Sequence, residues 1–565
     1  MNIMLAPKNQ KQKVIFSIFK CSKNNNMSRD VNFFKIKTHL VFIVIASFFI
    51  GTSSDAQVSN AQLAGLKYRM IGPHRAGRTV GISGVADQPN VFYIGVNNGG
   101  VWKTTDYGHT WKPIFDAENT GSVGDVAVAP SNANVIYVGS GEGIQRPDLS
   151  IGNGLYKSSD AGKTWTNMGL HDAQQIGGIS IDPKNENRIF VAALGHPYGP
   201  NKERGVYRSL DGGKTLEQVL YIDENTGAVQ VLIDPNHTNI VFATIWAARQ
   251  GPWENGAWDG EASGLYKSMD GGTTWKKIIN GLPNEPINSV REDAVRKGLL
   301  FAGSENAVYF SIDAGEHWQS LRLNMPATSI RDLVIKEDDL VIGTHGRSFW
   351  ILDNITPLRQ INLNQNQETV LFKPQKALRI RWNMNTDTPL PPEEPAGENP
   401  PDGAMIDYYL SAHSKGEVTL EILNAKKEII RTFSSNDTLY TIPEVNIPLY
   451  WIRPQQTLAA SAGAHRFLWD MKYAPLNVPA AYPMTAIVHN TPPDATAPWV
   501  MPGTYTIRLT ADGKTQEQPL TIAMDPRVKT SSVEWKRQHD LSMICYEGRK
   551  KSMNKFPLIQ QKFTQ

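Results

Sequence analysis

Cysteine is nearly absent from this 565-residue chain, which contains only Cys21 and Cys545. Cys21 lies in an N-terminal segment that we expect to be removed, so one thiol remains in the mature protein. A single thiol excludes an internal disulfide framework. An exported protein without disulfides fits a bacterial periplasm or cell surface better than a eukaryotic extracellular space, where disulfides are common.

The chain also has little continuous apolar sequence. The run LVFIVIASFFI at 40–50 is too short for a membrane-spanning helix of about 20 residues. Two lysines precede it, and Ser54 and Ala56 offer small residues at the −3 and −1 positions of a cleavage site. These features predict a signal peptide, with an uncleaved anchor as the alternative. Counted from Met27 the signal has an ordinary length, so we expect residues 1–26 to precede the true start.

Neither sign of charge dominates the mature chain. Eight of the 57 Lys and Arg and two of the 54 Asp and Glu lie in residues 1–56, which leaves 49 basic and 52 acidic residues. The formal net charge of +3 therefore belongs to the N-terminal segment. A mature charge of about −3 gives no indication of nucleic-acid binding.

A short phrase recurs five times between residues 104 and 318. Its aspartates are 54, 51, 59 and 43 residues apart, and self-similarity at a period of roughly 40–50 residues indicates a solenoid or a propeller. The copies are TTDYGHTW at 104–111, SSDAGKTW at 158–165, SLDGGKTL at 209–216, SMDGGTTW at 268–275 and SIDAGEHW at 311–318.

Each copy has the chemistry of a hairpin turn held by an aspartate. The carboxylate accepts backbone N–H groups across the turn, Gly tolerates a positive φ, and Trp is large enough to pack between sheets. The phrase resembles the Asp-box (BNR) repeat, from which the third copy departs only at Leu216. We expect the aspartates to be structural locks on the outer rim rather than catalytic or calcium-binding groups: Asp106, Asp160, Asp211, Asp270 and Asp313.

Residues 57–360 predict an all-β domain, an Asp-box β-propeller of four-stranded blades. We count six blades in the sequence, with a seven-bladed propeller as the alternative. The turn at the aspartate joins the third and fourth strands of a blade. The sixth blade, at 329–353, lacks this turn but keeps the strand pattern. The segment LKYRMI at 66–71 is predicted to close the ring by adding a strand to the last blade, which removes exposed sheet edges.

The repeat stops after Pro357. Residues 361–403 hold a Pro-rich connection and the first sandwich strands, 404–528 predict a β-sandwich, and 529–565 a short helical tail. Hairpins are expected at 417–435 and 503–524. This half resembles the immunoglobulin-like sandwich of flagellar hook-cap proteins, a frequent partner in secreted Bacteroidetes proteins.

Five polar or aromatic stretches follow equivalent points of their blades and are expected to converge on one face, where propeller ligands bind. They are GPHRAGR at 72–78, VNNGG at 96–100, GSGEGIQRPD at 139–148, IWAARQGPWENGAWDGE at 245–261 and GTHGRSFW at 343–350. The ligand-binding candidates in them are His74, Arg75, Arg78, Asn97, Asn98, Arg146, Trp246, Arg249, Trp253, His345 and Arg347. An equally weighted interpretation is that these loops only solvate the face and pin neighbouring blades.

The propeller half resembles secreted BNR-repeat glycosyl hydrolases related to sortilin-type propellers and endo-xyloglucanases. The phrases GPHRAGR, VWKTTDYGHTW and THGRSFWILDNITPLRQ carry the resemblance. Such relatives are longer, which suggests that blades were lost near 281–283. The resemblance implies a catalytic base after the second strand of the first blade, where this chain has Asn97, and an amide takes no proton at neutral pH. The resemblance therefore favours the fold over that mechanism.

Three functions are consistent with these observations. The first is an exported propeller that binds a glycan, a peptide or a partner protein near its channel. The second is a glycoside hydrolase with a non-standard carboxylate pair, Glu142 with Glu254 or Glu261. The third is a structural module of an exported assembly. No metal, cofactor or nucleic-acid partner is expected.

Overall fold

The structure, a computed structural model, describes residues 58–72, 78–143, 149–247, 260–362, 368–380, 393, 396–412, 416–439, 441, 455–476 and 497–564. Nearly all of its regular structure is β, with 44% of the chain in strands and 8% in helices. This confirms the all-β fold class and the propeller.

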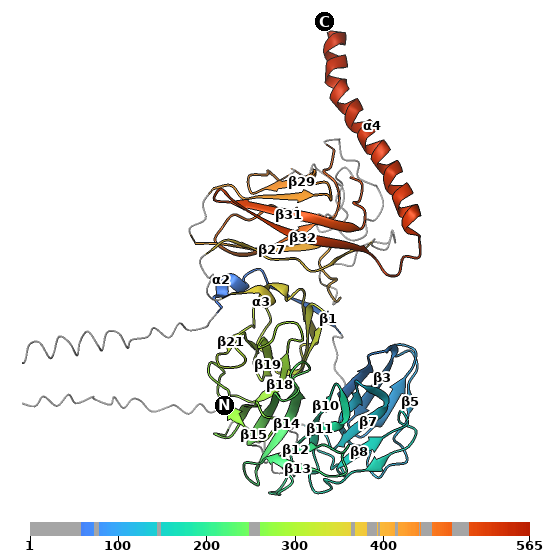
Figure 1. Cartoon of the computed structure of the whole chain (residues 1–565), viewed down its shortest axis with the longest axis vertical. Coiled ribbons are helices and arrows are strands. Elements are labelled where there is room, and N and C mark those ends of the chain that lie inside the picture. Colours follow the sequence, from blue (N-terminus) through green and yellow to red (C-terminus); the bar gives the residue numbers. More distant parts are fainter. Residues whose placement is uncertain are drawn as a thin grey trace, which may run out of the picture. The chain divides into compact units, whose positions relative to one another are not determined.

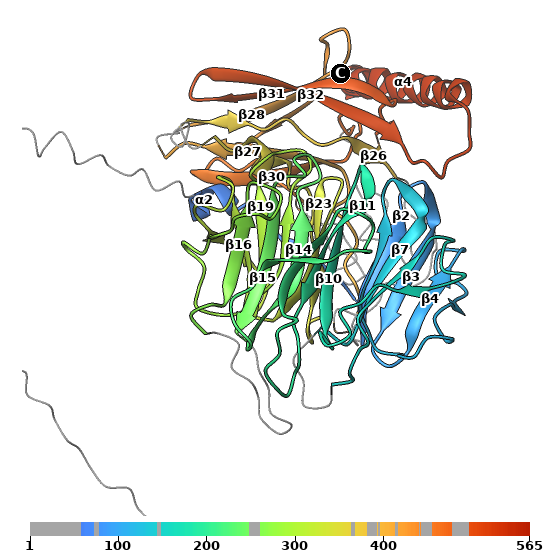
Figure 2. The same ribbon diagram turned by 60° about the horizontal axis from the view of Figure 1, so that its bottom comes forward.

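Six four-stranded antiparallel sheets form blades 1 to 6 of the propeller, as counted from the sequence. In Figure 2 the strands of one blade, such as β14, β15 and β16, lie side by side. Blades 1 to 3 consist of β2 (Thr79–Val85), β3 (Gln88–Val96), β4 (Gly100–Thr104) and β5 (Lys112–Pro113); β6 (Val123–Ala129), β7 (Asn132–Ser140), β8 (Leu155–Ser158) and β9 (Thr166–Asn167); and β10 (Ile176–Asp182), β11 (Asn185–Ala193), β12 (Gly205–Ser209) and β13 (Glu217–Leu220).

Blades 4 to 6 have the same order of strands from hub to rim. They consist of β14 (Thr226–Ile233), β15 (Val241–Ala247), β16 (Gly264–Ser268) and β17 (Lys276–Lys277); β18 (Ile287–Glu292), β19 (Leu300–Ser304), β20 (Val308–Ser311) and β21 (Gln319–Ser320); and β22 (Ile330–Lys336), β23 (Asp339–Thr344), β24 (Phe349–Leu352) and β1 (Tyr68–Gly72). The short helices α2 (Asn60–Leu63) and α3 (Thr356–Gln360) flank this last blade in the sequence.

The outermost strand of blade 6 comes from the opposite end of the propeller sequence. β1 pairs antiparallel with β24, with Tyr68 opposite Leu352 and Arg69 opposite Ile351. Two contacts hold β1 in place: the Tyr68 hydroxyl donates to the Leu321 carbonyl at 3.0 Å, and the Arg69 guanidinium forms a bidentate pair with Asp353. The prediction that LKYRMI adds a strand to the last blade is therefore confirmed.

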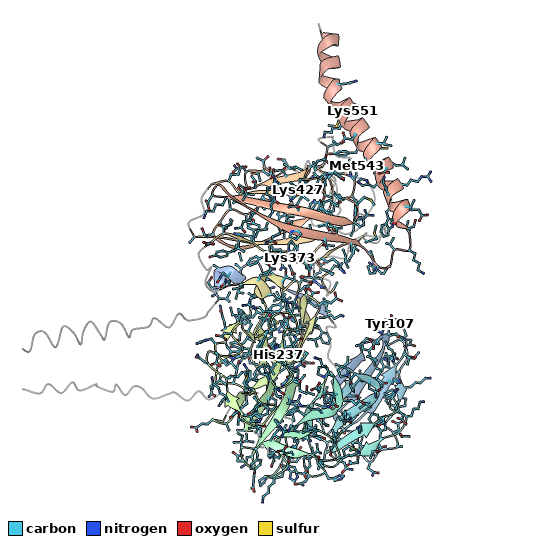
Figure 3. All side chains as sticks on the ribbon, in the orientation of Figure 1. Tyr107, His237, Lys373, Lys427, Met543 and Lys551 are labelled. Carbon is cyan, nitrogen blue, oxygen red and sulfur yellow. The ribbon has the colours of Figure 1, made fainter. Side chains whose placement is uncertain are left out.

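The five recurrent aspartates share one hydrogen-bonding pattern. At Asp160, Oδ1 accepts the Thr164 amide at 2.9 Å, Oδ2 accepts the Thr164 hydroxyl at 2.7 Å, and the Ser158 hydroxyl donates back to Oδ1. Ala161 and Gly162 both have left-handed backbones, with φ of 60° and 87°. Glycine adopts such a backbone most readily, and it occupies the second of these two positions in every copy. Tyr107, at the tip of the first turn, lies at the outer edge of its blade (Figure 3).

Three of the tryptophans that end the phrase join neighbouring blades at the rim. The indole N–H reaches a backbone carbonyl of the preceding blade, from Trp165 to Ile114 at 2.7 Å, from Trp275 to Val219 at 3.1 Å and from Trp318 to Ile278 at 3.1 Å. The indole of Trp111 donates to Gly108 of its own turn. The third copy has Leu216, which has no such donor. The residues predicted as turn locks thus lie next to side chains that stabilise the junctions between blades.

A second set of hydrogen bonds joins the innermost strands around the hub. In four successive junctions, a side chain of one inner strand accepts a backbone amide of the next. The bonds are Val128 N to Ser83 Oγ (3.1 Å), Ile179 N to Asp125 Oδ2 (2.7 Å), Ile233 N to Ser180 Oγ (2.9 Å) and Val290 N to Gln230 Oε1 (2.8 Å). The junction of blades 5 and 6 uses an ion pair instead, Arg291 with Asp332 at 2.5 Å.

The C-terminal half of the chain contains two sheets that enclose one apolar core (Figure 1). One consists of β25 (Val370–Leu371), β27 (Ala404–Leu410) and β30 (Gly463–Trp469), and the other of β26 (Ala377–Arg379), β32 (Lys514–Met524), β31 (Gly503–Ala511), β28 (Thr419–Leu423) and β29 (Ile429–Ser434). Both predicted hairpins are present, β28–β29 and β31–β32. The second turns at Asp512 and Gly513, whose φ angles of 52° and 71° explain the Asp-Gly pair.

A buried ionic network connects blade 6 to this sandwich. The Arg466 guanidinium on β30 donates to Asp407 Oδ1 at 2.7 Å and to the Asp353 and Asn354 carbonyls at 2.8 and 3.0 Å. Asn354 Nδ2 donates to Asp407 Oδ2 at 2.7 Å. Burial raises the pKa of Asp407, and the Arg466 charge opposes that rise. The sequence motif HRFLWD therefore supplies a contact between the two halves of the chain.

The C-terminal helix lies within the tail that the sequence predicted at 529–565. α4 extends over Ser532–Thr564, 33 residues. Ser531 begins it by hydrogen bonding to Glu534, and the residues beyond Lys551 continue the same regular backbone. None of the helices in the described part of the chain combines the length and apolar character required to cross a membrane.

Candidate functional site

The candidate site lies at one end of the blades, where second strands finish and inner strands begin. Antiparallel pairing places the ends of β3, β7 and β23 beside the starts of β2, β6 and β22. The loops that carry the predicted ligand residues leave the sheets at these points. We refer to this surface as the loop end of the propeller.

Two of the five predicted stretches meet directly at the loop end. Asn97, after β3 of blade 1, donates from Nδ2 to Glu142 Oε2 of blade 2 at 3.1 Å. Gln175, before β10 of blade 3, accepts the Glu142 and Gly143 amides at its Oε1, at 2.5 and 2.9 Å. Its Nε2 donates to the Ser150 carbonyl at 2.9 Å. One polar network therefore joins three consecutive blades.

Glu142 is enclosed by this network. It is 0% exposed, and its second oxygen, Oε1, accepts the Ser150 amide at 3.0 Å. The Asn97 Oδ1 atom beside it is buried without a hydrogen-bond partner in the described part of the chain. A carboxylate with both oxygens engaged and no exposed surface orders loops well, but it is poorly placed to exchange a proton with a ligand.

Trp246 is also turned into the protein. It is 2% exposed, packs with Leu194 and Val229, and donates from its indole N–H to the Ile287 carbonyl of blade 5 at 3.0 Å. Of the two interpretations open for this residue, packing against an adjacent blade has the better geometric support. Glu261 is exposed, and its backbone carbonyl accepts Lys277 Nζ.

Three of the predicted cationic or imidazole side chains are exposed at the loop end. Arg78 precedes β2 of blade 1, and His345 and Arg347 follow β23 of blade 6. The β23–β24 turn is held by Thr344, whose hydroxyl accepts the Arg347 amide at 3.0 Å and donates to the Ser348 carbonyl at 2.7 Å. Asn98, with φ of 55°, is exposed in the turn after β3. His345 and Arg347 therefore present exposed side chains at the loop end.

The remaining sequence candidates lie outside the residues that the structure describes. They are His74, Arg75, Arg146, Arg249, Trp253 and Glu254. Their assignment to the ligand surface rests on the sequence alone.

The hub contains charged residues that the sequence analysis did not single out. Asp125 on β6 accepts two backbone amides, and burial nevertheless raises its pKa to about 6, with the Asp332 charge adding to the rise and Arg291 opposing it. Arg331 lies 3.3 Å from Glu305 in the same region. The sequence feature that could have identified Asp125 and Asp332 is an aspartate at the third position of two inner strands, VGDVAVA and IRDLVIK.

A metal centre has no support in this part of the molecule. Among the described residues, no group of three or more His, Cys, Asp or Glu side chains is arranged to hold a metal ion. The site therefore consists of arginine, imidazole and amide groups around a hub with two carboxylates.

Fold and site together define a six-bladed propeller with a polar loop end. No protein-family model matches the chain. Among curated proteins, it is similar to a xyloglucanase from a Paenibacillus species, 24% identical over 272 residues that cover 41% of this chain and 24% of that protein. It is also similar to xyloglucanase Xgh74A of Acetivibrio thermocellus, 26% identical over 260 residues that cover 41% of this chain and 29% of the relative.

Among solved structures, the chain is similar to the GH74 enzyme of Niastella koreensis, with 15% identity, a TM-score of 0.39, and coverage of 59% of this chain and 50% of that one. Over about 41% of its length the chain is distantly homologous to xyloglucanases. It spans about a quarter of the length of the curated relatives it matches.

Proposed function

We propose that the protein is an exported β-propeller that binds a carbohydrate at its loop end. The observation that carries this proposal is the distant homology to xyloglucanases. The loop end also offers polar groups of the kind that bind sugars. Arg78, Asn98, His345 and Arg347 have hydrogen-bonding groups suited to sugar hydroxyls. A peptide or partner protein remains the main competing ligand.

Binding is favoured over hydrolysis by the state of the predicted catalytic groups. Asn97 stands where the resemblance implies a catalytic base, and it donates to Glu142 rather than facing a ligand. Glu142 in turn has both oxygens occupied. Neither residue is arranged for proton transfer to a glycosidic oxygen.

The proposal includes the finer assignments made from the sequence. The repeats are Asp-box (BNR) units of the sortilin-like type, the sandwich at 404–528 is immunoglobulin-like, and the source is a Bacteroidetes bacterium. Residues 1–56 direct export to the periplasm, the cell surface or the medium.

A binding assay with a matched control tests the main proposal. Affinity electrophoresis and calorimetry with xyloglucan and other plant β-glucans are expected to show binding that weakens at least fivefold in Arg347→Ala. Lys163→Ala, an equally exposed change on the Asp160 turn at the rim, should leave the affinity unchanged. If the protein binds none of the polysaccharides but binds members of a peptide library, the ligand is a peptide and the carbohydrate proposal is wrong.

A hydrolase is the second candidate, and the hub supports it. Burial raises the pKa of Asp125 to about 6 and the charge of Asp332 adds to the rise, so a carboxyl that holds its proton longer has a second carboxylate near it, as glycosidases require. If the protein cleaves glycans, release of reducing ends should fall at least 100-fold in Asp332→Asn. Cleavage that survives Asp332→Asn but not Glu261→Gln would favour the carboxylates chosen from the sequence.

A further inference from the structure

Five of the six junctions between blades bury apolar rows of side chains on both sheets. In blade 2, Val126, Val138 and Tyr156 lie opposite one another across three strands and face blade 1. Val126 is 1% exposed. On the other side of a blade, Phe301 and Phe310 of blade 5 face blade 6 and are 0% and 1% exposed. These rows show the exposed fractions expected of side chains on a blade face that a neighbouring blade covers.

The row of blade 1 that corresponds to Val126–Val138–Tyr156 is not covered in this way. It consists of Ile82, Ile94 and Trp102, which pair across β2, β3 and β4 in the same register. Ile82 is 60% exposed, and Ile94 and Trp102 are only half-buried. Val126 and Ile82 are comparable aliphatic residues, so the contrast comes from the missing neighbour rather than from the side chain.

The opposite face of blade 6 has the same property. Val334, Val341 and Ile351 form a row across β22, β23 and β24 that corresponds to the buried phenylalanines of blade 5. Val334 is 47% exposed, and Val341 and Ile351 are half-buried. Phe349 and Ile71 on this side of the sheet are exposed as well.

The hub bonds stop at the same place. Each of the other five junctions has a hydrogen bond or an ion pair between inner strands, whereas none joins β22 of blade 6 to β2 of blade 1 within the described residues. The ring therefore has one seam, bounded by the Ile82 row of blade 1 and the Val334 row of blade 6.

We propose that this seam is an interface between two copies of the chain. In a two-fold arrangement, the Ile82 row of one copy packs on the Val334 row of the second copy, and the reverse contact forms at the same time. The argument is complementarity: the two rows are apolar over the three strands named for each, and each is the half that a blade junction of this sequence requires of the other. A two-fold axis repeats such a contact without leaving either face open.

The size of the contact is sufficient for a dimer. Four strands about 4.8 Å apart, with about five residues of about 3.3 Å each, give one sheet face of roughly 300 Å². Each copy contributes two faces, so roughly 600 Å² of flat surface per copy is covered, and side-chain relief increases the accessible area. Stable interfaces bury about 800 Å² per partner. The estimate therefore falls in the range of a specific but modest dimer.

Light scattering with matched variants tests the proposal. The purified full chain is expected to have twice the mass of one chain, and Ile82→Glu or Val334→Glu should halve it. Met269→Glu is the control, because Met269 is also 60% exposed but lies in the Asp270 turn at the rim. Circular dichroism should show unchanged folding in all three variants, since each side chain is already exposed. A wild-type chain of single-chain mass, or a dimer that tolerates both seam variants, overturns the proposal.

Disulfide trapping separates a dimer from a ring that closes on itself. In chains that lack Cys21 and Cys545, one copy carries Ile82→Cys and the other Val334→Cys. Mixing them under mild oxidation should give a disulfide-linked pair of chains. If the two substitutions in one chain instead give a rapid disulfide within that chain, and the mixed chains do not cross-link, the seam closes internally and the proposal is wrong.

Discussion

The ionic contact at Arg466 offers the clearest quantitative prediction. Replacing Arg466 with Met keeps the length of the apolar stem and removes the guanidinium. Asp407 then stays buried, at 5% exposed, with one remaining hydrogen bond from Asn354. The Asp353 and Asn354 carbonyls lose their donor as well.

The expected cost is large because a charge is left behind in a buried place. Removing one partner of a buried ion pair typically destabilises a protein by about 3–5 kcal/mol. This is a substantial share of the roughly 5–15 kcal/mol that holds a typical domain folded. Asp407→Asn added to Arg466→Met should recover most of the loss, since it removes the uncompensated charge while the amide still fits the space.

Urea unfolding monitored by tryptophan fluorescence measures the effect. Lys276→Met is the control, because Lys276 pairs with Glu316 at 2.9 Å but the two side chains are 68% and 54% exposed. An exposed pair of this kind contributes about 0–1 kcal/mol. The reasoning is refuted if Arg466→Met costs no more than Lys276→Met, or if the double variant is less stable than Arg466→Met alone.

Three further predictions concern the blades. Burial, with the nearby Asp234 carboxylate, raises the pKa of Glu292 to about 7. Between pH 4.5 and 7 the folded protein therefore holds a proton that the unfolded chain has released. The free energy of unfolding should then fall as the pH rises from about 4.5 through 7. Glu292→Gln should flatten that decline in melting temperature, and an unchanged profile would contradict the assignment. Asp160→Ala should lower the melting temperature by removing both hydrogen bonds to Thr164, and it should leave glycan affinity unchanged, as calorimetry can check. Trp246→Ala should cost about 3–5 kcal/mol in urea unfolding, whereas a ligand-stacking role would predict weaker binding with little loss of stability.

Much of the fold was available from the sequence because the repeated phrase constrains local geometry. An aspartate, a serine or threonine two residues earlier and a hydroxyl four residues later determine one turn, as Asp160, Ser158 and Thr164 show. The distance between such turns then gives the length of a blade. The closing strand at Tyr68–Gly72 was predictable because the last blade had only three strands of its own.

The site was harder to predict, because polarity at a loop does not say which way a side chain points. Glu142 and Trp246 are of residue types that are common in sugar-binding sites. In the structure, however, the Glu142 carboxylate accepts hydrogen bonds from Asn97 and Ser150, and Trp246 packs in the protein interior. Their burial depends on loops from other blades, which no local pattern records. Asp125 was missed for the converse reason, since a single acid inside an apolar strand has no motif around it.

The hub bonds have a consequence for how such a protein can change over evolutionary time. At four junctions the donor is a main-chain amide, which every residue except proline provides regardless of its side chain. A blade with an acceptor side chain on its inner strand can therefore pack against a newly inserted blade, and the inserted blade needs no matching substitution. Duplication, exchange or deletion of whole blades then requires no coordinated mutation at the centre of the wheel.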